Sequence, residues 1–128
     1  MTALERIMHI EDDPSIQEVA RVALEVVGGF TVRSCDSGAA GVAAADSFAP
    51  QLVLLDVMMP GMDGPQTLAE LRKLPVMKDV PVVFMTAKAQ TQEVTAYRGL
   101  GAAGVIIKPF DPMTLSAQIR EIWEQQHA

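Results

Sequence analysis

The pattern of apolar and polar positions alternates between strand-like and helix-like segments five times along the chain, which predicts five strands, each followed by a helix. The third strand is apolar without alternation, which is typical of a strand covered on both faces. The expected strands cover residues 6–10, 30–34, 51–56, 82–86 and 105–108. This repeated strand-helix order predicts an α/β fold, with a parallel sheet, right-handed crossovers and helices on both faces.

The helices between these strands are predicted from apolar stripes and from capping residues. The expected helices run from residue 14 to 27, from Asp36 or Ser37 to about residue 49, from 65 to 74, from 91 to 100, and from 112 onward. The first helix should bury one stripe, made up of Ile16, Val19, Ala20, Ala23, Val26 and Val27. Asp111 is expected to cap the last helix, with Pro112 at its first position.

Length and composition predict one domain over residues 1–128, with one mainly aliphatic core and no effector domain. The chain is 49% hydrophobic but only 5% aromatic. No apolar stretch approaches the roughly 20 residues of a membrane span, and the N-terminus lacks the blocks of a signal peptide. A lone Cys35 excludes an internal disulfide, which fits a reducing cytoplasm. The net charge of -6, without a basic run, argues against direct nucleic-acid binding.

Polar residues stand at the ends of four predicted strands. Glu11-Asp12-Asp13 follows the first strand, Asp56 ends the third, Thr86 ends the fourth and Lys108 ends the fifth. In an open parallel sheet, ligands bind beyond the carboxyl ends of the strands. We therefore expect these side chains to meet in one site.

A cluster of carboxylates needs compensation, and a hard divalent cation supplies it. Mg²⁺ prefers oxygen ligands in octahedral geometry and usually binds one or two carboxylates together with phosphate oxygens and water. Asp12 and Asp56 are the expected direct ligands, and Glu11 is expected to act through a water molecule. The backbone carbonyl of Met58, on the turn after Asp56, completes the predicted set.

The same cluster suits phosphoryl transfer, in which negative charge on three equatorial oxygens must be neutralised. Asp56 is the candidate nucleophile and would form an acyl phosphate. Lys108 can pair with one phosphoryl oxygen, and the Thr86 hydroxyl can bond to another.

Each of these residues also has a simpler interpretation. The acidic run can be a solvated helix N-terminus favoured by the helix dipole, with Asp13 as its cap. Asp56 can be a turn residue, Thr86 an ordinary strand residue and Lys108 a surface charge. Their coincidence at four strand ends favours the shared site.

The motifs at these strand ends resemble those of receiver domains of bacterial response regulators, the phospho-acceptor half of two-component signalling. The matching stretches are Ile10-Glu11-Asp12-Asp13-Pro14, residues 54–64 around Asp56, Thr86-Ala87, and Lys108-Pro109-Phe110. The resemblance extends over almost the whole chain. It implies a flavodoxin-like (βα)5 three-layer sandwich with the strand order 2-1-3-4-5.

The resemblance also assigns roles to the site residues. It implies that a histidine kinase or a histidine phosphotransfer protein phosphorylates Asp56, and that Glu11, Asp12, Asp56 and the Met58 carbonyl hold Mg²⁺. Lys108 would contact the phosphoryl group, the bond between Lys108 and Pro109 would be cis, and Thr86 would be the switch hydroxyl.

One position departs from the pattern of many receivers, in which an aromatic residue stands three positions before the lysine and moves with the threonine. Here that position holds Val105, whose β-branched side chain has no comparable rotamer swing. Tyr97 in the fourth helix is an alternative for this role. The resemblance places the downstream target on the surface of the fourth helix, the fifth strand and the fifth helix.

Three functions remain open from the sequence. The first is a phosphorylation-gated binding module or phosphate relay, which is not an enzyme beyond its own phosphorylation and dephosphorylation. The second is a Mg²⁺-dependent small-molecule phosphatase that acts through an aspartyl phosphate; Met58 stands where a second acid would support it. The third is a scaffold of the same fold that is never phosphorylated.

Overall fold

Five parallel strands form one sheet in the order β2-β1-β3-β4-β5. The computed structural model describes residues 3–88 and 90–127. The strands are β1 (Arg6–Ile10), β2 (Thr31–Cys35), β3 (Leu52–Asp56), β4 (Val82–Thr86) and β5 (Gly104–Ile107). The expected fold and strand order are confirmed, and the predicted strand bounds are right to within a residue.

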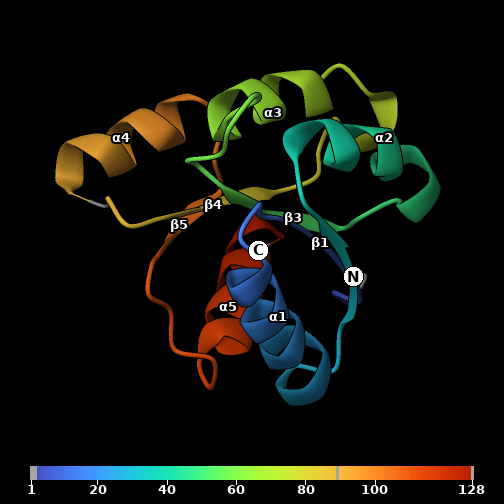
Figure 1. Ribbon diagram of the computed structural model, residues 1–128, viewed down its shortest axis with the longest axis vertical. Helices are drawn as coiled ribbons and strands as arrows, with labels where there is room; N and C mark the ends of the chain where they lie inside the picture. The colour runs from blue at the N-terminus through green and yellow to red at the C-terminus, as the bar shows by residue number, and fades with distance from the viewer. Residues whose placement is uncertain (1–2, 89, 128) are drawn as a thin grey trace.

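Helices cover both faces of this sheet, so the fold has three layers (Figure 1). The helices are α1 (Pro14–Val22), α2 (Gly38–Phe48), α3 (Gly64–Leu71), α4 (Thr91–Gly99) and α5 (Leu115–Gln126). A π-helical turn over Ala23–Val27 continues α1, and a short 3-10 turn spans Pro75–Met77. In Figure 1, α1 and α5 lie on one side of the sheet, and α2, α3 and α4 lie on the other. None of the described helices is both long enough and apolar enough to cross a bilayer.

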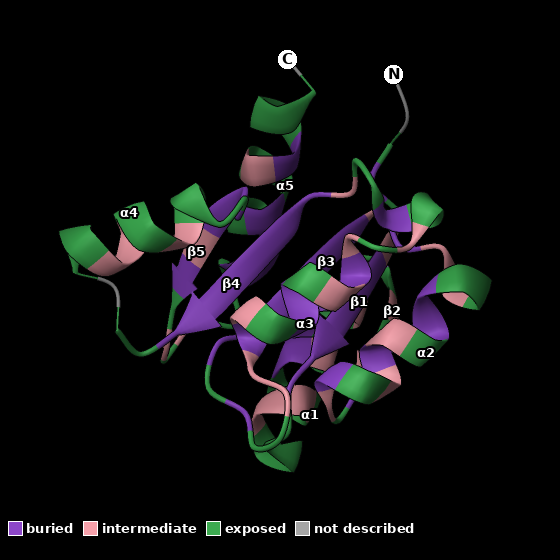
Figure 2. Ribbon diagram, turned by 90° about the horizontal axis from the view of Figure 1, so that it is seen from above, coloured by how far each residue is buried: buried purple, intermediate pink, exposed green. Residues whose placement is uncertain are grey.

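The core lies on the two faces of the central strands. All five residues of β3 and all five of β4 are buried, as the purple arrows in Figure 2 show. The continuous apolar run before Asp56 therefore reflects cover on both faces, as predicted. A rigid, fully buried strand thus carries Asp56 to the edge of the sheet.

The predicted stripe on the first helix is only partly right. Ala20 and Ala23 are buried, but Val19 is 45% exposed and Val26 is 74% exposed. The hydrogen bond from the Gly28 amide to the Ala23 carbonyl spans five residues, so the helix widens at this point. A wider turn rotates Val26 away from the face that a regular helix would bury, whereas Val19 lies before this turn and its exposure has another cause.

Two other predicted helix bounds are wrong. The third helix ends at Leu71, before the predicted limit of residue 74. The fifth begins at Leu115 rather than at Pro112, with Thr114 at its N-cap. The carboxylate of Asp111 instead accepts the Met113 amide at 2.9 Å, which closes a tight turn ahead of the helix.

Candidate functional site

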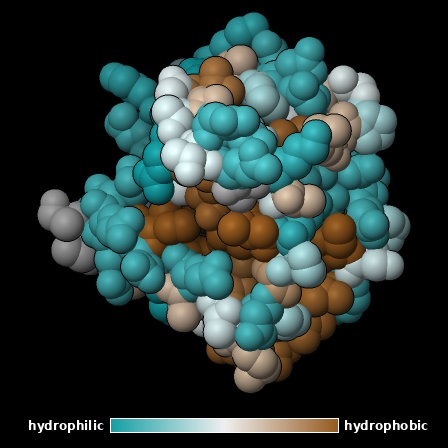
Figure 3. Space-filling view, turned by 90° about the vertical axis from the view of Figure 1, so that its left-hand side faces the viewer, coloured by the Kyte–Doolittle hydropathy of each residue, from teal (hydrophilic) through white to brown (hydrophobic). Residues whose placement is uncertain are grey.

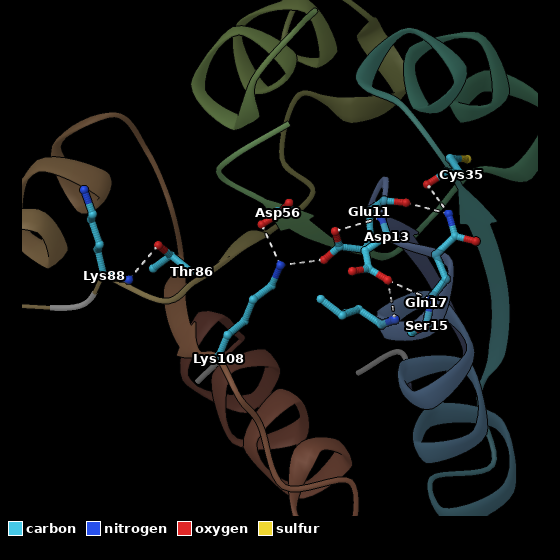
Figure 4. A network of polar contacts seen from close by, with 10 residues as sticks. Glu11, Asp13, Ser15, Gln17, Cys35, Asp56, Thr86, Lys88 and Lys108 are labelled. Carbon is cyan, nitrogen blue, oxygen red and sulfur yellow. Dashed lines mark hydrogen bonds and ion pairs between the residues drawn. The ribbon is translucent and has the colours of Figure 1, made fainter. Parts of the chain in front are cut away.

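The strand register brings the predicted site residues to one edge of the sheet. Asp56, the last residue of β3, is paired with Met85 of β4, and Thr86 is paired with Ile107 of β5. The backbone continues this alignment past the strands, since the Lys108 amide donates to the Thr86 carbonyl at 2.9 Å. The loop after β1 completes the group, as the close view in Figure 4 shows.

Three carboxylates form the centre of the site. Glu11, Asp12 and Asp56 each place one oxygen within 4.8 Å of the other two. Glu11 and Asp56 are buried, with 1% and 3% of their surface exposed, whereas Asp12 is exposed. Lys108 reaches between the two buried acids (Figure 4), and its Nζ lies 2.7 Å from Glu11 Oε1 and 2.9 Å from Asp56 Oδ1.

These charges act strongly on one another because water is largely excluded. Burial raises the pKa of Glu11, and the negative charge of Asp56 raises it further, against the opposing effect of Lys108. Burial alone would lower the pKa of Lys108, but its bonds to Glu11 and Asp56 outweigh burial and raise that pKa. One ammonium therefore stabilises two buried carboxylates and leaves the cluster with surplus negative charge.

The donor set fits a hard divalent cation. Glu11 Oε1 pairs with the Lys108 ammonium at 2.7 Å, and no other described residue donates to it, so it can accept a further ligand. The exposed carboxylate of Asp12 leaves one side of the cluster open to water, and Mg²⁺ retains several waters when it binds to protein. Met58, the source of the predicted carbonyl ligand, lies on the exposed loop after β3.

Two helix caps fix the loops that carry the acids. Asp13 Oδ1 accepts the amides of Ser15 at 2.8 Å and Ile16 at 3.3 Å, which confirms Asp13 as the cap of α1. Asp63 forms a capping box with Gln66 at the start of α3.

Gly64 begins α3 directly beside the end of β3. A Cβ atom at this position would lie 2.7 Å from the carbonyl oxygen of Asp56. Only glycine permits so close an approach of the two backbones. The loop between Asp56 and α3 is therefore held tightly at the mouth of the site.

Thr86 lies at the edge of the site without contacting the acid cluster. Its side chain is buried, and its hydroxyl accepts the backbone amide of Lys88 at 3.0 Å. Figure 4 shows this pair on the opposite side of Lys108 from Glu11. The hydroxyl is thus engaged by its own loop in this structure.

Val105, the other predicted switch position, is half-buried on β5 and is paired with Phe84 of β4. Tyr97 packs its ring edge-on against Phe84, with ring centroids 5.3 Å apart. An aromatic side chain of α4 thus contacts the strand that carries Thr86.

A sequence model of the response regulator receiver domain matches residues 7–120. The chain belongs to the response regulator receiver family. It is therefore a receiver domain of two-component signalling, as its motifs predict, and no comparison supports the phosphatase alternative.

Curated relatives and solved structures agree with this assignment. The receiver is 36% identical over 119 residues to the DNA-binding response regulator MtrA of Mycolicibacterium smegmatis, covering 93% of this chain and 50% of MtrA. It is 34% identical to the transcriptional regulator RpaA of Synechocystis, covering 91% of this chain and 48% of RpaA. The chain thus spans about half the length of the curated relatives it matches.

The structural matches cover nearly whole chains. A CheY-like receiver domain protein of Methanospirillum hungatei superposes with a TM-score of 0.83 at 26% identity, covering 98% of both chains. The chemotaxis protein CheY4 of Vibrio cholerae gives a TM-score of 0.87 at 24% identity, covering 94% of this chain and 99% of CheY4, and supports the fold.

Gln17 is a polar contributor to the site that the motifs do not reveal. Its side-chain amide donates to the backbone carbonyls of Glu11 and Cys35. The available signal is its spacing, because Gln17 stands four residues after the cap Asp13 and so shares one helix face with it.

His9 of the receiver gives a prediction for acid stability. Its ring is fully buried, and neither ring nitrogen has a hydrogen-bond partner within residues 3–88 and 90–127. Burial, and to a smaller extent the charge of Lys108, lower the pKa of His9 to about 4, compared with 6.5 in the unfolded chain. The stability that neutral His9 contributes is therefore present above pH 6.5 and is lost as the pH falls toward 4.

Between pH 7 and pH 4 we expect the parent to lose about 3 kcal/mol of unfolding free energy relative to the variant His9→Leu. Urea unfolding of both proteins at both pH values measures this loss. Because the other titrating groups are the same in the two proteins, their contributions cancel in the comparison. His127→Gln, which removes the exposed histidine, should follow the parent. Parallel pH profiles for the parent and His9→Leu would show that His9 does not resist protonation.

Proposed function

We propose that the receiver accepts a phosphoryl group on Asp56 in a Mg²⁺-dependent reaction and passes the signal on through a protein-binding surface. The observation that supports this most directly is the Lys108 ammonium held between the buried carboxylates of Glu11 and Asp56. From this position the Lys108 ammonium can pair first with the Asp56 carboxylate and then with a phosphoryl group bound to Asp56. Asp12 and Met58 extend the same cluster toward solvent.

In the proposed reaction an oxygen of Asp56 attacks the phosphorus of a phosphohistidine. The new O–P bond forms as the P–N bond breaks, and the leaving imidazole takes the electron pair and a proton from water. The Lys108 ammonium, which pairs with the Asp56 carboxylate before transfer, then pairs with a phosphoryl oxygen. The Thr86 hydroxyl leaves the Lys88 amide and donates to a second phosphoryl oxygen.

Glu11, Asp12, Asp56 and the Met58 carbonyl would hold the Mg²⁺ ion. A bound ion supplies positive charge against the phosphoryl oxygens during transfer. The surplus negative charge of the cluster supports this assignment, because the three carboxylates share one ammonium, which pairs with Glu11 and Asp56.

Phosphorylation would act on the rest of the receiver through Thr86. A phosphoryl group adds a charge of about -1.5 to -2 at neutral pH. Movement of the Thr86 hydroxyl would shift the backbone next to Phe84, and Tyr97 packs directly on Phe84. We propose that this contact takes over the role that Val105 is too small and too stiff to perform.

The surface of α4, β5 and α5 is the proposed output face. Figure 3 shows apolar side chains gathered in a hollow on this side of the molecule, within a rim of hydrophilic residues. Leu100 and Ile107 are more than half exposed. A shallow pocket of about 210 Å³ lies between Arg98, Val105 and Ile122. Such a surface suits a target protein.

The proposed phosphate donor is a sensor histidine kinase or a histidine phosphotransfer protein. MtrA is described as DNA-binding, but this chain matches only half of it. Because the net charge is -6, we propose that residues 1–128 act as one regulatory domain that contacts proteins rather than nucleic acid. A cytoplasmic location stays a prediction.

Incubation with acetyl phosphate tests the proposed function. With Mg²⁺ we expect up to one equivalent of acid-labile phosphate per chain, and with EDTA we expect none until Mg²⁺ is restored. Mass spectrometry of the intact chain measures the increment.

Two results would contradict the proposal. Turnover of phosphate esters far above one equivalent per chain would favour a phosphatase. A chain that binds neither Mg²⁺ nor beryllofluoride would be an unphosphorylated scaffold.

A further inference from the structure

A glutamine of α1 connects the acid loop to the neighbouring strand. Gln17 Nε2 donates to the carbonyl oxygen of Glu11 and, at 3.3 Å, to the carbonyl oxygen of Cys35. Glu11 directly follows β1, and Cys35 is the last residue of β2. Figure 4 shows the side chain of Gln17 extending from α1 to both.

The chemistry of the side chain matches these two acceptors. A carboxamide nitrogen carries two protons, so it can donate one hydrogen bond to each carbonyl. The Cys35 carbonyl also accepts the backbone amide of Glu11 at 2.9 Å, which is the last bond between the two strand ends. Gln17 therefore fixes the backbone at the end of β1, where the loop of Glu11, Asp12 and Asp13 begins.

This point controls where the acids lie. The carbonyl that Gln17 holds belongs to the peptide group between Glu11 and Asp12, so its orientation fixes the backbone from which both carboxylates project. Asp12 is exposed, and packing contributes little to its position. The Asp13 amide donates to Glu11 Oε2 at 3.3 Å, which links the same backbone to the buried carboxylate.

We propose that Gln17 is a positioning residue for the metal-binding acids, and that it sets the Mg²⁺ affinity of the receiver through the backbone of Glu11 and Asp12. This inference rests on the proposed function, since it concerns the same acid cluster. In this role Gln17 would act through the backbone and not by direct contact with the cation or the phosphoryl group. It acts by holding the loop in the geometry that the cation requires.

The chain offers a matched control at the other end of β1. Gln51 is also half-buried, and its Oε1 accepts the amides of Glu5 at 2.7 Å and Arg6 at 2.9 Å. Its Nε2 donates to the Ala3 carbonyl at 3.0 Å. Gln51 thus clamps the start of β1 as Gln17 clamps its end, but it lies away from the acids.

The test compares Gln17→Met and Gln51→Met with the parent. Methionine keeps the length of the side chain and removes the amide. We expect Gln17→Met to weaken Mg²⁺ binding about tenfold, the size of effect seen when a group that orients metal ligands is lost. Gln51→Met should stay within about twofold of the parent, since it leaves the ligand geometry intact. Isothermal titration calorimetry measures the affinities, and urea unfolding shows how far each variant is destabilised.

Two further readouts separate positioning from general destabilisation. Without Mg²⁺, hydrogen exchange at the Glu11 amide should quicken in Gln17→Met and not in Gln51→Met. With acetyl phosphate, raising the Mg²⁺ concentration should restore the labelling rate of Gln17→Met. Gln17→Asn keeps the amide on an arm one methylene shorter, should bind Mg²⁺ with intermediate affinity, and replaces Gln17→Met if that variant does not fold.

The outcomes distinguish this inference from the proposed function. If the parent binds Mg²⁺ and accepts phosphate, and the Gln17 variants bind Mg²⁺ as the parent does, the positioning role is wrong and the function stands. Equal loss of affinity in Gln17→Met and Gln51→Met would also overturn the role, because the effect would then be one of stability. A parent that binds no Mg²⁺ and accepts no phosphate overturns the proposed function, and the role of Gln17 with it.

Discussion

Asp56→Asn should reduce labelling by acetyl phosphate and Mg²⁺ to background. The amide oxygen of asparagine cannot form a stable acyl phosphate, so the acceptor is lost while the shape of the side chain is kept. The substituted side chain would still present an oxygen to Lys108, whose Nζ lies 2.9 Å from Asp56 Oδ1 in the parent. Intact-mass measurement of the phosphate increment gives the result directly.

The variant should remain folded, which makes the loss of labelling interpretable. Asp56 is buried beside Glu11, and its charge raises the pKa of that neighbour. Removing it relieves repulsion between two carboxylates, so we expect the unfolding free energy of the metal-free protein to stay the same or to rise. Asp46→Asn, on the exposed surface of α2, should label as the parent does.

Persistent labelling of Asp56→Asn would show that another carboxylate accepts the phosphoryl group. Asp12 would be the first to test, because one of its oxygens lies within 4.8 Å of oxygens of Glu11 and Asp56. Borohydride reduction and peptide mapping would locate the acceptor. Asp12 is exposed, however, whereas Asp56 ends a buried strand beside Lys108, and this difference favours Asp56 as the nucleophile.

The sequence predicted the position of the acid cluster because parallel strands leave little freedom at their ends. The strands of a parallel sheet all run in one direction. The residue at the carboxyl end of each buried strand therefore lies at the same edge of the sheet as the last residues of the neighbouring strands. Asp56 and Lys108 therefore meet although they are 52 residues apart in the chain. The acids after β1 reach the same edge for the same reason.

Details that depend on competing hydrogen bonds could not be predicted in this way. The Thr86 hydroxyl has two available partners, a ligand in the site and the amide of Lys88, and the structure shows it on Lys88. The π-helical turn after Val22 and the late start of α5 are also local features that the apolar pattern does not reveal. Gln17 carries no motif, and its role is visible only when α1, β1 and β2 are seen together.

Lys108→Met is expected to produce opposite changes in stability and in metal affinity. Lys108 is largely buried and is the ammonium that neutralises Glu11 and Asp56. Its removal leaves two buried carboxylates without their counter-charge, which should lower the unfolding free energy of the metal-free protein by about 3 kcal/mol. Urea unfolding in EDTA measures this loss.

The same change should tighten Mg²⁺ binding, because the cation would no longer compete with an ammonium for Glu11 and Asp56. Saturating Mg²⁺ should therefore recover part of the lost stability. Labelling by acetyl phosphate should nevertheless fall, since the methionine cannot pair with a phosphoryl oxygen. This combination of tighter metal binding and slower labelling separates a role in phosphoryl transfer from a purely structural one.

Lys73→Met is the matched control, because Lys73 forms a surface ion pair with Glu70 at 2.7 Å. Exposed pairs of this kind contribute about 0–1 kcal/mol, so stability, Mg²⁺ affinity and labelling should all stay close to the parent. If Lys108→Met labels at the parent's rate while binding Mg²⁺ more tightly, Lys108 stabilises the acids but takes no part in transfer. If both its affinity and its stability fall, Lys108 holds the acids in their binding geometry and ionised state rather than competing with the metal for them.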